Sequence, residues 1–299
     1  MSMTTHTTGP KRTTAHPHAE SASRRALLAA LPALALPAAW TQPAAAQTFD
    51  HGHAAWTALL RRHVRLIDGS RASQLRYAGM AADRAALKAW LATLSAVPRP
   101  AFDGWARGQQ MAFLINAYNG FTVELVLSRY PNLKSIKDLG SFLSSPWKPK
   151  WIPLLGETLS LDNIEHDMLR APGRYSDPRI HFAVNCASVG CPMLREEAFV
   201  AERLDAQLDE QARRFMGDRS RNRFSPASRR LELSKIFDWY GGDFNQGQHG
   251  ITSLAQFCAS QAEQLADLPA DRDAVRAQKL GIDFLDYDWA LNDARGEGR

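Results

Sequence analysis

The spacing of apolar residues predicts helices in the chain between residues 53 and 129. In residues 53–67 and 84–94, apolar side chains recur every three or four positions, which is the period of a helix with one buried face. Residues 109–129 are apolar on nearly every side, and a helix of that kind is expected to be buried. We therefore predict an N-terminal helical part around one buried central helix.

Beyond Pro131 the pattern changes to short strands and loops. Residues 151–155 and 158–161 predict a β-hairpin around Gly156 and Glu157, and residues 223–233 predict a second hairpin. The same part of the chain contains other predicted elements: a short helix from Asp162, helices over 196–216 and 252–266, and strands over 180–184 and 282–291. Helices followed by strands favour an α+β fold with a small mixed or antiparallel sheet. No linker, block of charge or internal repeat divides residues 47–299, so we expect a single domain.

The first 46 residues have the pattern of an export signal. A polar segment that ends with Arg24 and Arg25 is followed by an Ala/Leu-rich run over residues 26–40, and residues 44–46 are the small alanines that a signal peptidase accepts. This run is shorter than the roughly 20 residues that span a bilayer. The paired arginines are typical of a twin-arginine signal. We expect cleavage after Ala46 and a periplasmic mature chain with no membrane span.

The charge balance does not favour nucleic acid as a partner. Without its first 46 residues the chain has 32 basic and 30 acidic residues, and its short basic groups at 219–223 and 229–230 are more typical of a solvated loop than of a nucleic-acid surface. The familiar motifs for phosphate loops, dinucleotide folds, zinc proteases and serine hydrolases are absent from the sequence, and no cofactor is predicted. A small molecule or a peptide is the expected class of ligand.

Reactive residue types are densest in residues 179–192, which read Arg-Ile-His-Phe-Ala-Val-Asn-Cys-Ala-Ser-Val-Gly-Cys-Pro. If residues 180–184 form a strand, His181 and Asn185 share one face and Cys186 lies where the strand ends. A rigid element can hold reactive groups at such a place while the loop after it admits a ligand. We take this segment as the centre of the candidate site.

Three other segments are expected to lie beside it. Asn116 and Asn119 are three positions apart on the buried helix and so share a face. A buried amide without a hydrogen bond costs about 1–3 kcal/mol, so both should bind backbone, each other or a ligand site. Glu165 and His166 in the short helix, and Asp243 in a glycine-rich loop, complete the set of candidate neighbours.

Five phrases of the sequence together resemble one family, the proteins with domain of unknown function 547. They are Phe-Leu-Ile-Asn-Ala-Tyr-Asn (113–119), Leu-Ser-Leu-Asp-Asn-Ile-Glu-His (159–166), Asp-Pro-Arg-Ile-His-Phe-Ala-Val-Asn-Cys-Ala-Ser (177–188) with Cys-Pro (191–192), Ile-Phe-Asp-Trp-Tyr (236–240) with Asp-Phe (243–244), and Tyr-Asp-Trp-Ala-Leu-Asn (287–292). The resemblance covers about residues 100–292. It implies an α+β domain without an established activity. Some eukaryotic members carry a glutaredoxin-like domain as well, which is an associative indication of thiol chemistry.

The cysteines allow two interpretations. Cys186, Cys191 and Cys258 permit at most one disulfide within the mature chain, and Cys186 and Cys191 are the expected pair. On the first interpretation they form a structural bridge in a non-catalytic binding or scaffold module. Cys258 lies on an apolar helix face and is expected to be a buried, inert thiol.

On the second interpretation Cys186 is a nucleophile. His166 or His181 would act as its base, since a neighbouring imidazolium lowers the pKa of a thiol. Asn185, Asn116 or Asp243 would orient that imidazole. A redox pair of Cys186 and Cys191 is a variant of this hypothesis, although its spacing differs from that of thioredoxin-type motifs.

A zinc site is a third possibility that the spacing does not support. His166, His181, Cys186 and Cys191 have suitable ligand atoms but lack the close paired spacing of known zinc sites. No metal is therefore predicted. The leading hypothesis is an exported, enzyme-like domain that acts on a small molecule or peptide by thiol-based acyl transfer, hydrolysis or exchange. The alternative is the non-catalytic module with a structural disulfide.

Overall fold

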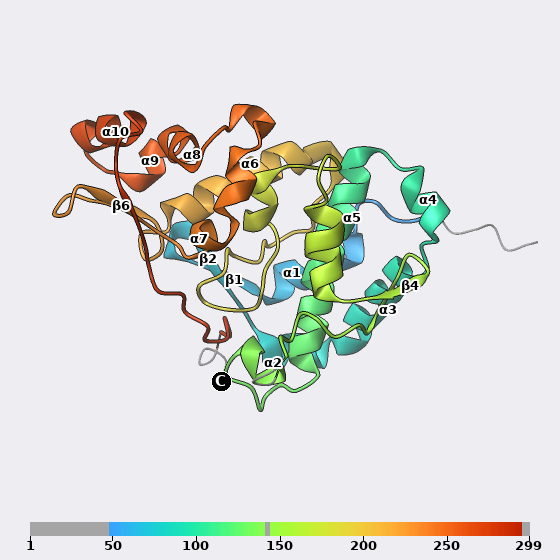
Figure 1. Ribbon diagram of the computed structural model, residues 1–299. Coiled ribbons are helices and arrows are strands. Elements are labelled where there is room, and N and C mark those ends of the chain that lie inside the picture. The colour runs from blue at the N-terminus through green and yellow to red at the C-terminus, as the bar shows by residue number, and fades with distance from the viewer. Residues whose placement is uncertain (1–47, 141–143, 295–299) are drawn as a thin grey trace, which may run out of the picture. The chain divides into compact units, whose positions relative to one another are not determined.

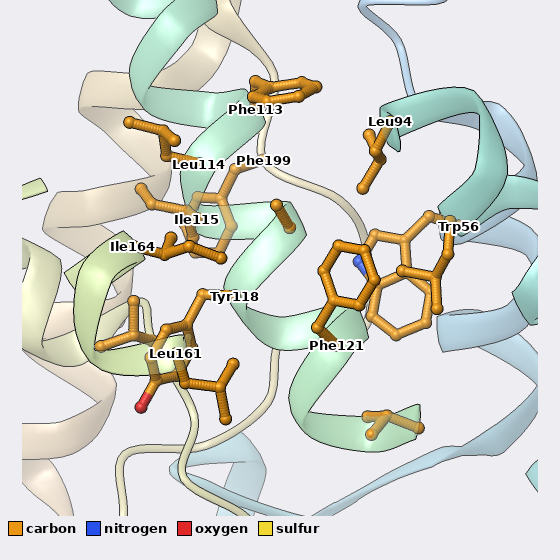
Figure 2. Close-up of a cluster of buried hydrophobic side chains, with 14 of the residues drawn as sticks. Trp56, Leu94, Phe113, Leu114, Ile115, Tyr118, Phe121, Leu161, Ile164 and Phe199 are labelled. Carbon is orange, nitrogen blue, oxygen red and sulfur yellow. The ribbon is translucent and has the colours of Figure 1, made fainter. Parts of the chain in front are cut away.

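The longest helix, α5 (Arg107–Leu127), lies at the centre of the fold in the computed structural model, which describes residues 48–140 and 144–294 (Figure 1). Every residue from Met111 to Val123 is buried, as the all-round apolar pattern predicts. Figure 2 shows Trp56 and Leu94 on one side of this helix and Leu161 and Ile164 on the other.

The helices before α5 cover one of its sides. They are α1 (Ala54–His63), α2 (Tyr77–Ala82), α3 (Arg84–Ser95) and α4 (Arg99–Asp103). Gly120 allows α3 to approach closely, since a Cβ atom there would lie only 2.3 Å from the ring of Trp90. The helix predicted over 84–94 corresponds to α3, and the predicted central helix corresponds to α5, so both predictions are confirmed.

The predicted helix over 53–67 is wrong in its last part. The chain leaves α1 at His63 and continues as strand β1 (Val64–Ile67), which pairs with β2 (Ala72–Leu75) around the turn η1 (Asp68–Ser70). Leu75 also forms a bridge with Asp293, so this hairpin is held by a distant segment. Strand pairing therefore determines the structure of residues 64–67, although their apolar spacing predicts one more turn of helix.

Two other small sheets follow. Strands β3 (Ile152–Leu154) and β4 (Glu157–Leu159) form the first predicted hairpin, but its turn is Leu155–Gly156, because both residues have positive φ. The other sheet contains the antiparallel pair β5 (Arg223–Ser225) and β6 (Arg230–Leu233), with β7 (Ile282–Phe284) parallel to β6. The predicted α+β class with a small mixed sheet is thus confirmed.

The predicted strand over 282–291 ends early. Only β7 is a strand, and residues 285–294 continue as an extended segment that we call the C-terminal strap. The backbone amides of Val189 and Gly190 donate to the carbonyls of Ala290 and Asp288, each at 2.8 Å. The strap therefore lies against the loop that contains the two candidate cysteines.

The chain after α5 contains many short helices. They are η2 (Ile136–Leu139), the π-helix η3 (Asn163–Leu169), η4 (Pro178–Phe182), η5 (Ala201–Arg203), α6 (Leu204–Gly217), α7 (Ile236–Tyr240), η6 (Gly241–Asn245), η7 (Gln248–Gly250), α8 (Leu254–Ser260), α9 (Ala262–Leu265) and α10 (Pro269–Arg276). The predicted helix over 196–216 begins later than expected, and the one over 252–266 is divided at Gln261.

The predicted strand over 180–184 is wrong. This segment is largely the 3₁₀-helix η4, which Asp177 caps by accepting a hydrogen bond from the backbone amide of Arg179 at 3.0 Å. Pro178 stands at its first position, where proline is favoured in helices. Both faces of the segment are buried, because Ile180 packs in one hydrophobic cluster and Phe182 in another. A short apolar run of this kind does not distinguish a strand from a buried helical turn.

These two clusters make up the interior of the described residues. The first surrounds α5, and the second lies between α6, the β5–β7 sheet and α7 to α10. Residues 178–194 run along the boundary of the two. Within residues 48–140 and 144–294, every helix is too short or too polar to cross a lipid bilayer. The predicted export signal lies outside the described residues.

Candidate functional site

A cavity of about 340 Å³ opens beside the cysteine loop. Its wall is formed by α5, η3, η4, α7, the loop before β3 and the C-terminal strap. Five candidate residues line it: Glu165, His166, His181, Cys186 and Cys191. The structure thus brings together segments that are far apart in the sequence, as the sequence predicts for this set. The other four candidates lie behind the wall.

Two of these four are the asparagines of the buried helix, and both bind backbone. Asn119 donates to the carbonyl of Ala183 at 2.9 Å and accepts from the amide of Asn185 at 2.8 Å. Asn116 forms the same two-way contact with the backbone of Phe199, at 2.8 and 3.0 Å. They fasten the cysteine segment and the chain after it to α5.

Asn185 shapes the cysteine loop from inside. Its side chain accepts from the amide of Ala187 at 3.0 Å and donates to the carbonyl of Pro192 at 2.7 Å. Ala187 has a φ of 61°, which is uncommon for a residue with a Cβ atom and gives the loop its sharp turn. Asn185 thereby closes the loop and brings its two cysteines together.

The sulfur atoms of Cys186 and Cys191 lie 2.8 Å apart. Both are free thiols, so the predicted disulfide is not formed in the structure, and the two groups share a hydrogen bond instead. The backbone amide of Cys186 also donates to the Cys191 sulfur at 2.9 Å. Cys186 is half-buried at the cavity wall, whereas Cys191 is 5% exposed.

Two hydroxyl groups complete the surroundings of the Cys186 sulfur. Tyr287 of the C-terminal strap places its hydroxyl 3.0 Å away, and the hydroxyl of Ser188 lies at 3.2 Å. The two hydroxyls are 2.9 Å apart. In the described part of the chain, the hydrogen bonds of this sulfur go to Cys191, Ser188 and Tyr287 and not to a histidine, so the predicted thiol–imidazole pair is not in direct contact.

These contacts shift the pKa values of the two thiols in opposite directions. Burial opposes ionisation of Cys186, but hydrogen bonds from Cys191, Ser188 and Tyr287 outweigh it and lower the pKa of the thiol. Burial and the neighbouring Cys186 raise the pKa of Cys191 well above its ordinary value. Because the thiolate is the reactive form, Cys186 is the better nucleophile of the pair.

His181 is held by an acidic residue, as one of the predicted arrangements requires. Its Nε2 atom lies 2.7 Å from Oδ2 of Asp243, and its ring stacks on Tyr240 with 4.2 Å between centroids. Arg170 donates to both oxygens of the same carboxylate, at 2.7 and 3.0 Å. Asp243, rather than Asn185 or Asn116, therefore orients the imidazole.

The pKa of Asp243 lies well below its ordinary value. Burial opposes ionisation, but hydrogen bonds from His181 and Arg170 outweigh that effect and stabilise the carboxylate. His166 is also tied to this group, since its Nδ1 atom lies 2.8 Å from the Arg170 guanidinium. The two histidines thus belong to one network, in which His181 is buried and His166 is partly exposed.

Glu165 extends from η3 into the cavity wall and is only 6% exposed. Burial and the neighbouring Glu165 carboxylate raise the pKa of Tyr118 and of Tyr240. For Tyr240 the pKa is raised beyond the usual range of a phenol. Glu165 is therefore a buried acid beside two phenols.

Several contributors to the site were missed by reasoning from residue types. They are Tyr118, Arg170, Ser188, Tyr240 and Tyr287. Tyr118, Ser188, Tyr240 and Tyr287 stand inside the phrases that carry the family resemblance, which is the signal that could have identified them. Arg170 stands outside those phrases, so nothing in the sequence pointed to it.

The ligand atoms proposed for zinc do not converge. Among the described residues, no three His, Cys, Asp or Glu side chains are placed to hold a metal ion together. His181 directs Nε2 to Asp243, and each cysteine contacts the other. The geometry therefore gives no support to the zinc hypothesis.

Comparison with known proteins identifies one family. Residues 102–216 match the model of a family described as "Protein of unknown function, DUF547". This confirms the resemblance predicted from the sequence, over a segment that runs from α4 into α6 and includes both cavity cysteines. No curated protein and no solved structure matches the chain.

Proposed function

We propose that this chain is an exported, periplasmic protein for thiol–disulfide exchange on a small molecule or peptide, with Cys186 as the attacking thiol and Cys191 as the second thiol. The contact of 2.8 Å between their sulfur atoms, at the wall of a cavity, is the observation that carries the proposal. The family resemblance is consistent with thiol chemistry but assigns no activity.

The exchange follows from the different environments of the two thiols. The Cys186 thiolate attacks one sulfur of a ligand disulfide, the ligand S–S bond breaks, and one ligand sulfur leaves as a thiolate. Cys191 then loses its proton and attacks Cys186, which releases the second ligand thiolate and leaves a Cys186–Cys191 disulfide. The dithiol loses two electrons and the ligand gains them, and the two thiol protons pass to the ligand sulfurs. The reverse sequence oxidises a ligand dithiol.

Other residues of the cavity support this chemistry in the proposal. Tyr287 and Ser188 stabilise the thiolate of Cys186 by hydrogen bonds. His181, oriented by Asp243, lines the same cavity and is placed to exchange a proton with a sulfur of the bound ligand. A half-buried nucleophile beside a buried second thiol also lets the intermediate be resolved within one molecule.

The test is a redox titration of the purified protein with trapping by an alkylating reagent and intact-mass measurement. We expect Cys186 and Cys191 to change together, by two electrons, as the ratio of glutathione to its disulfide changes. In the reduced protein, Cys186 should be alkylated first at neutral pH. Cys258 is the internal control, because burial raises its pKa to about 12.

Two outcomes would contradict the exchange function. If the two cysteines stay linked at every glutathione ratio and stay unlabelled until the protein is unfolded with a strong reductant, they are the staple of a non-catalytic module. If both stay reduced with excess glutathione disulfide, exchange is excluded. Acyl transfer or hydrolysis through Cys186 would then be the better candidate, since the His181–Asp243 pair has the arrangement of a base held by a carboxylate.

The periplasmic location is a separate part of the proposal. It is supported by the paired arginines, the apolar run and the alanines of residues 1–46, all outside the described residues. Changing Arg24 and Arg25 together to lysine should block export through a twin-arginine route. Cell fractionation measures this, and unchanged export of the double variant would contradict the twin-arginine assignment.

A further inference from the structure

The cavity wall has an unusual balance of charge. Its lining includes two acidic side chains, Asp162 and Glu165, and the thiol of Cys186 adds a negative charge when it ionises. Among the described residues that line it, none is a lysine or an arginine. The nearby Arg170 is bound to Asp243 and His166 behind the wall. The cavity therefore favours positive over negative groups.

Glu165 is the stronger of the two acidic features. It is 6% exposed and lies beside the hydroxyls of Tyr118 and Tyr240. Its charge interacts with that of Arg170, but the guanidinium of Arg170 is bound to Asp243 and His166. A buried carboxylate is costly unless a cation accompanies it, so a ligand cation is favoured beside Glu165. Asp162 begins the same helix and has 27% of its side chain exposed, so it presents a second carboxyl group closer to solvent.

Aromatic rings form much of the remaining wall. The rings of Trp239 and Tyr287 have centroids 4.9 Å apart, and Trp289 lies 4.4 Å from Tyr287 and 5.7 Å from Trp239. Trp147 lies 6.0 Å from Trp289. Trp239 is 44% exposed, which is high for a tryptophan in a cavity wall. Such a group of rings attracts cations through the negative faces of the π systems.

One ring of this group already binds a cation of the chain itself. The ammonium of Lys137 lies 4.8 Å from the centroid of Trp289. The combination of acidic groups and indole faces is the one by which proteins recognise organic ammonium groups, and each such contact contributes about 0.5–2 kcal/mol.

From this we propose that the cavity selects sulfur-containing ligands that carry a positively charged amine or quaternary ammonium group. The ligand sulfur lies at Cys186, and its cation lies among Glu165, Asp162 and the exposed indole of Trp239. This inference rests on the proposed exchange function, because it names the class of molecule that the cysteine pair acts on.

The test compares three disulfides of similar size and different charge: cystamine (cationic), bis(2-hydroxyethyl) disulfide (neutral) and 3,3′-dithiodipropionate (anionic). Each rate with the protein is divided by the rate with a free low-molecular-weight thiol at the same pH, because disulfides differ in intrinsic reactivity. We expect the normalised rate to be about tenfold higher for cystamine than for the neutral compound, and lowest for the anionic one. An equal normalised rate for all three would overturn the inference.

Variants locate the cation. Glu165→Gln should reduce the preference for cystamine over the neutral disulfide about tenfold. Asp162→Asn, at the less buried position, should reduce it in the same direction and serves if Glu165→Gln does not fold. The matched control is Asp167→Asn, since Asp167 is an exposed acid of the same helix that contacts Asn163. A loss of preference in the control as large as in Glu165→Gln would overturn the assignment.

Binding without reaction separates this inference from the proposed function. Cystamine and the neutral disulfide are each titrated into the Cys186→Ser protein and followed by calorimetry and tryptophan fluorescence. If cystamine binds more tightly while the wild-type protein performs no exchange, the cation site stands and the exchange function fails. If the wild type exchanges all three disulfides without preference and Cys186→Ser binds neither, the exchange function stands and the cation site fails.

Discussion

Replacing Cys191 by serine is expected to stop the exchange after its first step and leave a mixed disulfide on Cys186. The attacking thiolate is still present in this variant, but the sulfur that lies 2.8 Å away and resolves the intermediate is gone. Replacing Cys186 by serine should abolish both steps. Because a thiol such as glutathione must then resolve the intermediate from solution, turnover by Cys191→Ser should fall about 100-fold or more.

Intact-mass measurement after incubation with a small disulfide distinguishes these variants. Cys191→Ser should gain the mass of one half of the disulfide, and Cys186→Ser should gain none. Cys258→Ser is the control and should behave as the wild type does, because Cys258 is buried in the second hydrophobic cluster. Full turnover by Cys191→Ser would show that Cys191 takes no part in the reaction.

The pH dependence of the first step follows from the direction of the pKa shift. The pKa of Cys186 is lowered from the ordinary 9.0, so a larger fraction of it is thiolate than of an ordinary thiol at the same pH. The profile of its alkylation rate against pH should therefore lie at lower pH than that of an ordinary thiol, with the rate falling as the pH falls through the lowered pKa. The rate of mixed-disulfide formation by Cys191→Ser should follow the same profile.

The position of the site was predictable because its parts are dense in the sequence. Asn185, Cys186 and Cys191 lie in one short segment that strongly apolar residues flank. The all-round apolar pattern of α5 indicated where the centre of the fold would be. Short-range patterns of this kind fix which segments are buried. Buried segments that carry polar groups must then satisfy them locally, which is why Asn119 was expected to meet a partner.

The local structure of the site was harder to predict. Residues 180–184 read as a strand because an apolar run of five residues looks the same whether it is a strand or a helical turn buried on both faces. Asp177 and Pro178 are a helix-start signal that decides between the two, and the sequence contained it. The turn of the first hairpin lies one residue earlier than predicted, at Leu155–Gly156. These are the two consecutive residues with the positive φ that the hairpin needs.

The partners of the reactive groups could not be derived from the sequence alone. Tyr287 contacts Cys186 across 101 positions, and Asp243 contacts His181 across 62. Several amides and carboxylates were chemically able to orient a histidine, and only the packing of α7 and η6 against η4 selects Asp243. Contacts between distant segments depend on the whole core, whereas residue type and spacing report only on neighbours.

Removing the charge of Asp243 is expected to produce the largest loss of stability among single substitutions at the site. The carboxylate lies between His181 and the guanidinium of Arg170, at 2.7 Å from each, and its side chain is 20% exposed. Asp243→Asn leaves the half-buried guanidinium of Arg170 without its counter-charge and the buried imidazole of His181 without the carboxylate that it contacts. Because loss of one partner of a buried pair costs about 3–5 kcal/mol, and this pair is partly solvated, we expect a decrease of about 2–4 kcal/mol in the free energy of unfolding.

The same pair makes stability dependent on pH in acid. The pKa of Asp243 is lower in the folded protein than its ordinary value of 3.8, so its contribution is fully present above that value and is lost as the pH falls through the folded pKa. Urea denaturation at several pH values measures this. The wild type should lose stability below about pH 4 more steeply than Asp243→Asn does.

The matched control is Asp238→Asn. Asp238 is close in sequence and pairs with Lys235 at 2.9 Å, but 41% of its side chain is exposed. Its loss should change stability by less than about 1 kcal/mol. If Asp243→Asn were as stable as this control and had the acid profile of the wild type, Asp243 would not be the residue that holds His181 in place. The alkylation rate of Cys186 in Asp243→Asn separates the loss of stability from any change in the reactivity of the thiol. This rate depends on the surroundings of the sulfur, which Tyr287, Ser188 and Cys191 provide. It should therefore stay within about twofold of wild type while the variant is folded.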